Sequence, residues 1–302
     1  MSAMPISIVT PCHNMAAYVA RTVESIVSQD YPRLQYIVVD GASTDGTVDI
    51  LRGYGNRINT LITEPDEGQY DAVQKGFGLA TGEVLAWLNA DDVYHPWTLS
   101  VVGEVFEKFP DLEWLIGLPS MINAQDQCIR LASGPAAYPQ AYIAKGWARG
   151  RFGPHLQQES MFWRRRLWER AGGLDLRWKY AADFELWTRF ARFAEPVAIT
   201  VPLAAFRARP GQRSSHEQYQ NDIRAICSRL PPPPRVWRCL ANRSLAMGCL
   251  CRLAMWRDCQ VISYSLQRNE WVKLRLRRPL SRSSLGQLIL DYALARSRPQ
   301  PA

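Results

Sequence analysis

Short apolar runs alternate with helix-like segments over the first 120 residues, and this alternation is the strongest constraint on the fold. Four runs have the length of a strand and end in a polar turn, at residues 6–10, 36–39, 59–63 and 84–88. Residues 17–28, 47–54 and 70–79 instead place apolar side chains three and four positions apart, as amphipathic helices do. The repetition predicts an α/β fold with a mixed, mostly parallel sheet flanked by helices.

The later part of the chain is less regular. Further strands are expected at residues 114–118 and 120–123, and helices near 165–171 and 183–193. Four consecutive prolines at 231–234 exclude helix and interior strand, so they mark a boundary. We expect one domain over residues 1–230, in two parts that meet near residue 125. Residues 231–302 are expected to form a basic, helical C-terminal extension.

The charge is divided unequally along the chain. Residues 1–130 carry 7 basic and 17 acidic residues, whereas residues 131–302 carry 29 basic and 11 acidic ones. With 47% hydrophobic residues the chain has the composition of a folded protein, which excludes wholesale disorder. An acidic half joined to a basic half suggests a site that gathers cations and anions, or a basic face for an anionic partner.

The cysteines and the hydropathy of the chain indicate where in the cell the protein is expected to lie. The seven cysteines lack the paired spacing of a structural zinc site, and a chain of 302 residues needs no disulfides to fold. Neither a signal peptide nor an apolar run of the about 20 residues that a membrane span needs is recognisable. We therefore expect a cytoplasmic protein, at most resting on the inner face of the cell membrane.

Polar residues cluster directly after three of the predicted strands, at residues 10–14, 40–45 and 89–92. Because open α/β sheets bind ligands at the carboxyl ends of their strands, we expect one site to face all three clusters.

Asp91 and Asp92 suit a hard divalent cation, although they could equally cap the following helix. Asp40 could accept a hydrogen bond from a base or a ribose, or belong to an ordinary turn. Lys75 could steady a diphosphate, or form a surface pair with Asp71.

Taken together, four blocks resemble family-2 glycosyltransferases, inverting nucleotide-sugar enzymes with the GT-A fold that build bacterial surface polysaccharides. The blocks are residues 7–14, 38–47, 64–76 and 80–83 ahead of the predicted metal loop, and the resemblance covers roughly residues 4–210. It implies a nucleoside-diphosphate sugar as donor and a glycan or lipid-linked hydroxyl as acceptor. It also implies that residues 1–125 are the nucleotide-binding part of the domain and residues 126–230 the acceptor-side part. The donor-binding residues that it implies are Thr10, Pro11, Asn14, Asp40, Ser43, Gln69, Tyr70, Asp71, Lys75, Asn89, Ala90 and Asp91.

The resemblance further implies a divalent metal, Mg²⁺ or Mn²⁺, that bridges the diphosphate and is held by Asp91 and Asp92. Asn89 stands where the family's D-x-D motif has its first Asp, which removes one negative charge. The segment 180–189 is similar to the family's E-D-x-D-L-W segment and implies Asp183 as the general base. The acceptor-side residues are expected to be His155, Gln158, Glu159, Glu185 and Trp187.

Two other classes of function share some of these sequence features. A nucleotidyltransferase that acts on sugar phosphates would need a basic, glycine-rich loop after the first strand, and residues 10–14 contain no Lys or Arg. A basic nucleic-acid-binding protein is suggested by 13 basic against 3 acidic residues over 235–302, but no nucleic-acid motif is present. The same segment, with Trp237, Trp256 and Trp271, could contact anionic lipid or pack on the catalytic domain.

Overall fold

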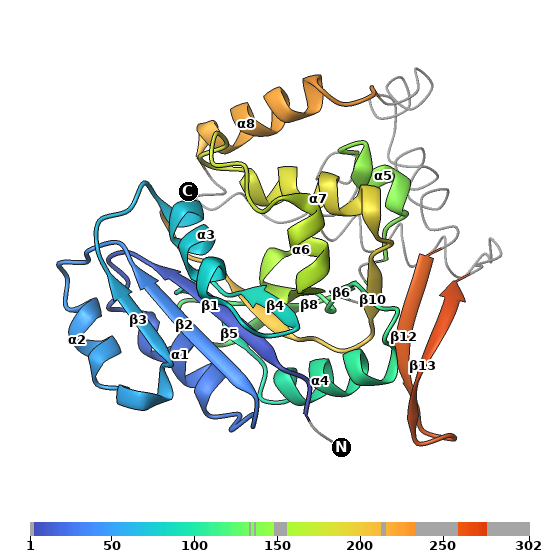
Figure 1. Cartoon of the computed structure of the whole chain (residues 1–302), viewed down its shortest axis with the longest axis horizontal. Helices are drawn as coiled ribbons and strands as arrows, with labels where there is room; N and C mark the ends of the chain where they lie inside the picture. The colour runs from blue at the N-terminus through green and yellow to red at the C-terminus, as the bar shows by residue number, and fades with distance from the viewer. Residues whose placement is uncertain are drawn as a thin grey trace.

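A computed structural model describes residues 3–132, 134–135, 137–147, 156–212, 216–232 and 259–276. Its centre is a nine-stranded sheet in the order β13-β12-β10-β6-β9-β4-β1-β2-β3 (Figure 1). The strands, in that order, are Glu270–Leu276, Cys259–Ser265, Val197–Ile199, Trp114–Ile116, Met161–Arg164, Val84–Trp87, Ile6–Cys12, Leu34–Asp40 and Thr60–Thr63. Five of its eight strand pairings are parallel, so the predicted α/β fold with a mostly parallel sheet is confirmed.

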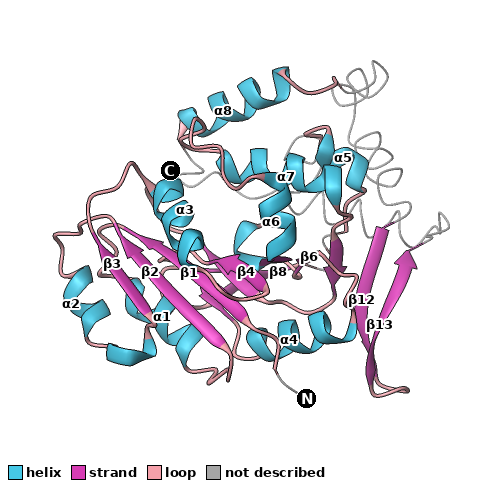
Figure 2. Ribbon diagram, viewed as in Figure 1, coloured by secondary structure: helices cyan, strands magenta, loops and turns pink. Residues whose placement is uncertain are grey.

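Helices cover both faces of this sheet (Figure 2). They are α1 (Val19–Val27), α2 (Thr47–Arg52), α3 (Gln69–Leu79), α4 (Thr98–Lys108), α5 (Gln140–Ala144), α6 (Arg165–Ala171), α7 (Ala182–Phe193) and α8 (Glu217–Ser228). Side chains alternate along each central strand, so Val9 packs in the core under α3, α6 and α7, whereas Ile8 packs in the core over α1 and α4. Burial on both faces explains why these strands are continuously apolar.

Strand β9 reverses the direction of the sheet at its centre. It lies between β4 and β6 and runs antiparallel to both. At its end Arg164 is buried and donates hydrogen bonds to the carbonyl oxygens of Phe106 (2.7 Å) and Leu112 (3.2 Å). The chain then enters α6 and α7, so the position of β9 determines where both helices meet the sheet.

A cluster of aromatic rings attaches α7 to the sheet. Trp187 of α7 lies 5.6 Å, between ring centroids, from both Trp87 of β4 and Trp163 of β9, and 5.7 Å from Trp114 of β6. All four indoles are at most 1% exposed. Offset and edge-to-face ring pairs at this separation stabilise beyond the area that they bury. The first turn of α7 is thereby held above the carboxyl end of β4.

A second sheet adjoins the same end, in the order β5-β11-β7-β8. Its strands are Val93–Tyr94, Ala204–Arg207, Ser120–Ile122 and Cys128–Leu131. Short 3-10 turns lie at Gly55–Arg57 and Gln158–Ser160. None of the helices in the described part of the chain is long and apolar enough to cross a bilayer.

Over residues 259–276, the C-terminal extension differs from the helices that were expected. Residues 259–276 form the hairpin β12–β13, which pairs through β12 with β10 and so extends the main sheet. Alternation of apolar and polar residues in both strands, with β-branched Val261 and Val272, favours strands over helices. Trp271 is buried and donates to Glu104 (2.9 Å), so it does not face a membrane. Trp237 and Trp256 lie outside the described residues.

Two glycines of α3 provide a matched test of the packing between α3 and β1. A Cβ on Gly76 would lie 2.5 Å from a methyl carbon of Val9, whereas a Cβ on Gly78 would meet no atom within 4 Å. We expect Gly76→Ala to lower the free energy of unfolding by about 1–3 kcal/mol through overpacking. Gly78→Ala should leave it unchanged or raise it by up to about 1 kcal/mol. Chemical denaturation measures both, and equal effects would contradict the packing described.

Candidate active site

The loops that follow β1 and β2 are joined by hydrogen bonds at the carboxyl edge of the sheet. Asn14 accepts from the backbone N–H of Thr44 (2.9 Å), and its own N–H donates to the hydroxyl of Ser43 (2.8 Å). Nδ1 of His13 lies 2.9 Å from the carbonyl oxygen of Gly41. Asn14 has a φ of 53°, a conformation that Asn tolerates better than most residues. Two of the three predicted clusters therefore form one surface.

Asp40 lies at the base of this surface and is fully buried. Its carboxylate accepts from the backbone N–H (2.9 Å) and the hydroxyl of Ser43. Thr10 and Pro11 are also buried, and the hydroxyl of Thr10 accepts from Tyr36 (3.0 Å) within the core. The side chain of Thr10 therefore belongs to the packing of β1, and the surface is made by Asn14 and the turn after β2.

The start of α3 carries the next predicted residues. Lys75 forms ion pairs with Glu64 (2.9 Å) and Asp71 (3.3 Å). The Asp71 carboxylate also accepts from the backbone N–H of Glu67 (3.1 Å). The hydrogen bonds to Glu64 and Asp71 raise the pKa of the Lys75 ammonium, which stays charged near neutral pH. Lys75 is thus partly neutralised by two carboxylates, as the surface-pair interpretation expected.

Asn89 lies at the end of β4 and is the centre of a polar network. Its carbonyl oxygen accepts from Gln69 (2.5 Å), and its amide donates to Gln158 (3.3 Å) and to Asp92 (3.3 Å). Gln158 in turn donates to the backbone carbonyl of Trp87 (2.6 Å). Ala90 is buried beside this network. The neutral amide of Asn89 therefore links α3, β4 and the turn that precedes β9.

Both carboxylates after Asn89 contact the segment at the end of β11, Asp91 through a guanidinium and Asp92 through a backbone N–H. Asp91 accepts from Nε of Arg209 (2.7 Å), and the two side chains are 13% and 16% exposed. Asp92 is buried and accepts from the backbone N–H of Arg207 (2.9 Å), while Nε of Arg207 donates to the carbonyl oxygen of Asp91 (2.6 Å). Burial, together with the charges of Asp91 and Glu159, raises the pKa of Asp92.

These contacts test whether the predicted metal ligands fit a divalent cation. Asp92 is buried and hydrogen-bonded to protein groups, Asn89 carries no charge, and Asp91 already binds a guanidinium. Within the described ranges, no three His, Cys, Asp or Glu side chains are grouped so that they could hold a metal ion. The donor set therefore does not fit Mg²⁺ or Mn²⁺, which prefer charged oxygen ligands.

Asp183 lies in the first turn of α7 and is half-buried. One of its carboxylate oxygens accepts from the hydroxyl of Tyr70 (2.9 Å) and from the backbone N–H of Phe184 (2.7 Å). The helix has Ala181 at its N-cap position, so Asp183 does not serve as its N-cap. Because Tyr70 and Gln69 are consecutive, the start of α3 connects Asp183 to Asn89.

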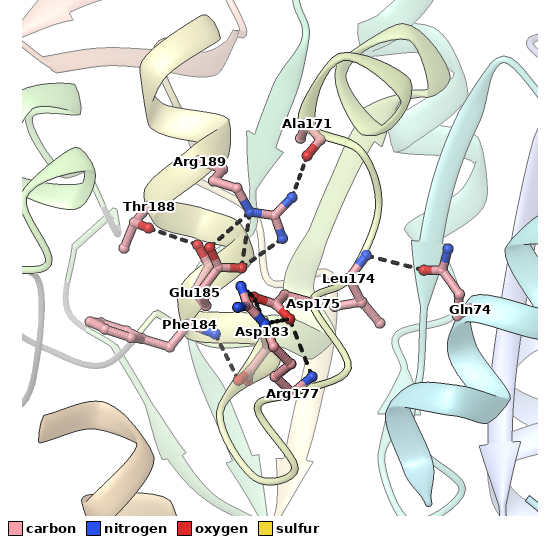
Figure 3. Close-up of polar contacts among 10 residues, drawn as sticks. All are labelled: Gln74, Ala171, Leu174, Asp175, Arg177, Asp183, Phe184, Glu185, Thr188 and Arg189. Atoms are coloured by element: carbon pink, nitrogen blue, oxygen red, sulfur yellow. Dashed lines mark hydrogen bonds and ion pairs between the residues drawn. The ribbon is translucent and has the colours of Figure 1, made fainter. Parts of the chain in front are cut away.

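Glu185 is engaged differently from Asp183, as Figure 3 shows. Arg189 binds both carboxylate oxygens of Glu185, at 2.6–2.9 Å, and also donates to the backbone carbonyl of Ala171. Glu185 thus ties α7 to the end of α6. Trp187 is part of the buried aromatic cluster, which removes it from any acceptor surface. His155 lies outside the described residues.

Glu159 is buried behind the network of Asn89. It is 3% exposed, and its Oε1 has no hydrogen-bond partner in the described part of the chain. Burial raises the pKa of Glu159 to about 8, and the nearby charges of Asp91 and Asp183 add to the effect. Glu159 is therefore mostly protonated at neutral pH, whereas Asp183 on the α7 side of the surface is half-buried.

Sequence reasoning missed the two arginines that contact Asp91 and Asp92. Arg207 and Arg209 are two residues apart across the end of a short strand, and nothing in their spacing singles them out. A surface hollow of about 400 Å³ also exists, lined by Arg33, Gln35 and Glu83 among others. It lies at the amino ends of β1, β2 and β4, which is the opposite edge of the sheet from the polar clusters.

Comparison with known proteins identifies the family. The model for glycosyl transferase family 2 matches residues 7–115. An uncharacterized glycosyltransferase of Mycobacterium tuberculosis, Rv1514c, is 31% identical over 211 residues, which are 68% of this chain and 76% of that protein. An uncharacterized glycosyltransferase of Nostoc sp. is 32% identical over 133 residues, but those residues are 43% of this chain and only 41% of the relative.

Two solved structures share the fold. S. aureus TarS (residues 1–349) in complex with UDP-GlcNAc superposes with a TM-score of 0.57 at 18% identity, covering 82% of this chain and 70% of that one. The mannosyltransferase PcManGT from Pyrobaculum calidifontis, in complex with GDP-Man and Mn²⁺, gives 0.53 at 20% identity and covers 85% and 76%. The sheet, its order of elements and these relatives agree: the chain is a glycosyltransferase of family 2 with the GT-A fold.

Proposed function

We propose that this enzyme moves a sugar, with inversion, from a nucleoside-diphosphate sugar to a hydroxyl group of a glycan or lipid-linked acceptor. The observation that carries the proposal is the connection through α3, in which Gln69 contacts Asn89 and Tyr70 contacts Asp183. It connects the donor side, at Asn89, with the base, Asp183, across one edge of the sheet. TarS with UDP-GlcNAc and PcManGT with GDP-Man support the class of donor.

In this mechanism the donor's nucleoside lies against the loops of Asn14 and Asp40, and its diphosphate lies near Asp91. The acceptor oxygen attacks C1 of the sugar as the bond from C1 to the diphosphate oxygen breaks. The electron pair of that bond leaves with the nucleoside diphosphate, and Asp183 takes the proton of the acceptor hydroxyl. Tyr70 holds the Asp183 carboxylate in position through its hydroxyl (2.9 Å).

This mechanism does not use the divalent metal that the sequence led us to expect at Asp91 and Asp92. PcManGT contains Mn²⁺ in its solved structure. In this chain, however, Asp91 is paired with Arg209 and Asp92 is buried. The proposed domain boundary at residue 230 also remains a proposal. The hairpin at 259–276 completes the main sheet, so the segment after the boundary contributes to the catalytic fold.

Asp183→Asn tests the general base. The amide keeps the shape of the side chain and can still accept from Tyr70, but it cannot take a proton. We expect kcat to fall by about 10²-fold or more, with the dissociation constant of the donor changed little. Release of nucleoside diphosphate from UDP-, GDP- and dTDP-sugars gives the rates.

Glu185→Gln is the matched control, two residues further along α7. It weakens the contact with Arg189 and should lower the melting temperature without a comparable loss of kcat. Normal turnover by Asp183→Asn together with an inactive Glu185→Gln would transfer the role of base to Glu185.

Glu159→Gln tests the assignment of Glu159 as a neutral group. The ordinary pKa of 4.5 is raised to about 8 in the folded protein, so the unfolded chain releases this proton first as pH rises. Wild-type stability should therefore decline between pH 5 and pH 8, by about 1–3 kcal/mol from this group. Glu159→Gln should be the more stable protein at pH 8, with the difference narrowing at pH 5. Melting curves that keep a constant offset across this range would refute the assignment.

We further propose that the extension from residue 231 rests on an anionic membrane surface, where a lipid-linked acceptor would be presented. Support comes from its charge, 13 basic against 3 acidic residues. Basic residues contribute about 1 kcal/mol each near an anionic leaflet. The full chain should sediment with vesicles rich in phosphatidylglycerol at low salt and be released at high salt. If the same fraction of protein sediments with these vesicles at low and high salt, or if no protein sediments with them, the membrane role is wrong.

A further inference from the structure

The two carboxylates that follow β4, Asp91 and Asp92, are already engaged by protein groups, and the partner of Asp91 is Arg209. Asp92 is buried, and its two oxygens accept from the backbone N–H of Arg207 (2.9 Å) and the amide of Asn89 (3.3 Å). Asn89 itself contributes no charge. Asp91 is the remaining carboxylate of the segment, and Nε of Arg209 already donates to it at 2.7 Å. A cation bound at Asp91 would meet the positive charge of this guanidinium at close range.

Arg209 is held in place from several elements. Its guanidinium lies over the ring of Tyr18, 5.3 Å from the centroid, and Tyr18 immediately precedes α1. Nη1 donates to the carbonyl oxygen of Pro210 (3.3 Å), and Nη2 contacts the sulfur of Met15 (3.7 Å). Sulfur is a weak acceptor, so the N–H groups of Nη2 retain most of their capacity to donate. The side chain is 16% exposed, which leaves it accessible from the site.

A guanidinium in this position has the properties that a diphosphate requires. It is permanently charged, and its planar fork can donate two parallel hydrogen bonds to phosphate oxygens. The loop of Met15 and Tyr18 follows β1, and Asp91 follows β4, so Arg209 lies where the carboxyl ends of two adjacent parallel strands meet. Nucleotides bind at such an edge in open α/β sheets.

We propose that Arg209, oriented by Asp91, binds the diphosphate of the donor and supplies the positive charge that a divalent metal would otherwise supply. The inference rests on the proposed function, because it presumes a nucleoside-diphosphate donor. Arg209 then neutralises the charge that develops on the diphosphate as the bond to C1 breaks. Asp91 is a positioning residue, because it acts through the guanidinium.

The test measures binding of UDP, GDP and dTDP by titration calorimetry, with EDTA and with Mn²⁺. Wild-type protein should bind at least one of them in EDTA, and Mn²⁺ should change its dissociation constant by less than about threefold. Arg209→Ala should weaken binding about tenfold or more, the scale of a lost charge-assisted hydrogen bond. Arg209→Lys should be intermediate, because an ammonium keeps the charge but lacks the fork.

Two further variants separate this role from a structural one. Asp91→Asn should bind within about fivefold of wild type in EDTA, because an amide oxygen still accepts from Nε while a metal would lose its charged ligand. Arg52→Ala, at an exposed ion pair with Asp49 on α2, is the matched control and should bind normally. If the melting curve shows that Arg209→Ala does not fold, nucleotide binding by Arg209→Lys is compared with that of the wild type instead.

The outcomes distinguish this inference from the proposed function. Binding that requires Mn²⁺ and is unchanged in Arg209→Ala or Arg209→Lys would overturn the role of Arg209 and restore the predicted metal, while leaving the glycosyl-transfer proposal intact. Failure of wild-type protein to bind any of the three nucleotides, with or without Mn²⁺, would overturn both proposals. Metal-independent binding that falls in the order wild type, lysine, alanine supports the inference.

Discussion

The packing of α7 against the sheet through four tryptophans is the interaction on which the geometry of the site depends. Trp87, Trp114 and Trp163 come from three adjacent strands, and Trp187 of α7 stacks on the first two and meets the third edge-on. None of the four indole N–H groups has a hydrogen-bond partner in the described part of the chain. The helix is therefore held by shape and burial. Loss of one such ring costs about 3–5 kcal/mol, far more than the roughly 1 kcal/mol of an exposed ion pair.

Charge balance at the carboxyl edge follows from this arrangement. Once α7 and the turn before β9 are fixed, Asp91, Asp92, Glu159 and Asp183 lie near one another, and four ionised carboxylates together would repel. The protein resolves this by burying and protonating Glu159, by surrounding Asp92 with protein donors, and by pairing Asp91 with Arg209. Asp183 is left half-buried and hydrogen-bonded to Tyr70, with an environment unlike that of the others.

Sequence patterns predicted the first half of the fold well, because local periodicity and burial agree there. The ranges expected for β1–β4, α1–α3 and α6 lie within two residues of those observed. The hairpin at 259–276 was not predicted from the sequence. This segment was interpreted by its positive charge, whereas the alternation of apolar and polar residues indicates strands. The positions of side chains were less predictable. Trp187 was expected to contact the acceptor but lies in the core, and Thr10 was expected to bind the donor but contacts Tyr36 inside the protein. The role of Arg209 depends on β11 pairing with β5, a contact between residues over 100 positions apart.

A crystal structure with the bound donor nucleotide measures the central claim most directly, namely that the carboxyl edge of the sheet is one site for donor and base. The account predicts the nucleoside against Asn14 and the turn of Asp40, the diphosphate beside Asp91 and Arg209, and C1 of the sugar facing Asp183. A nucleotide bound at the opposite edge, in the hollow lined by Gln35 and Glu83, would contradict it.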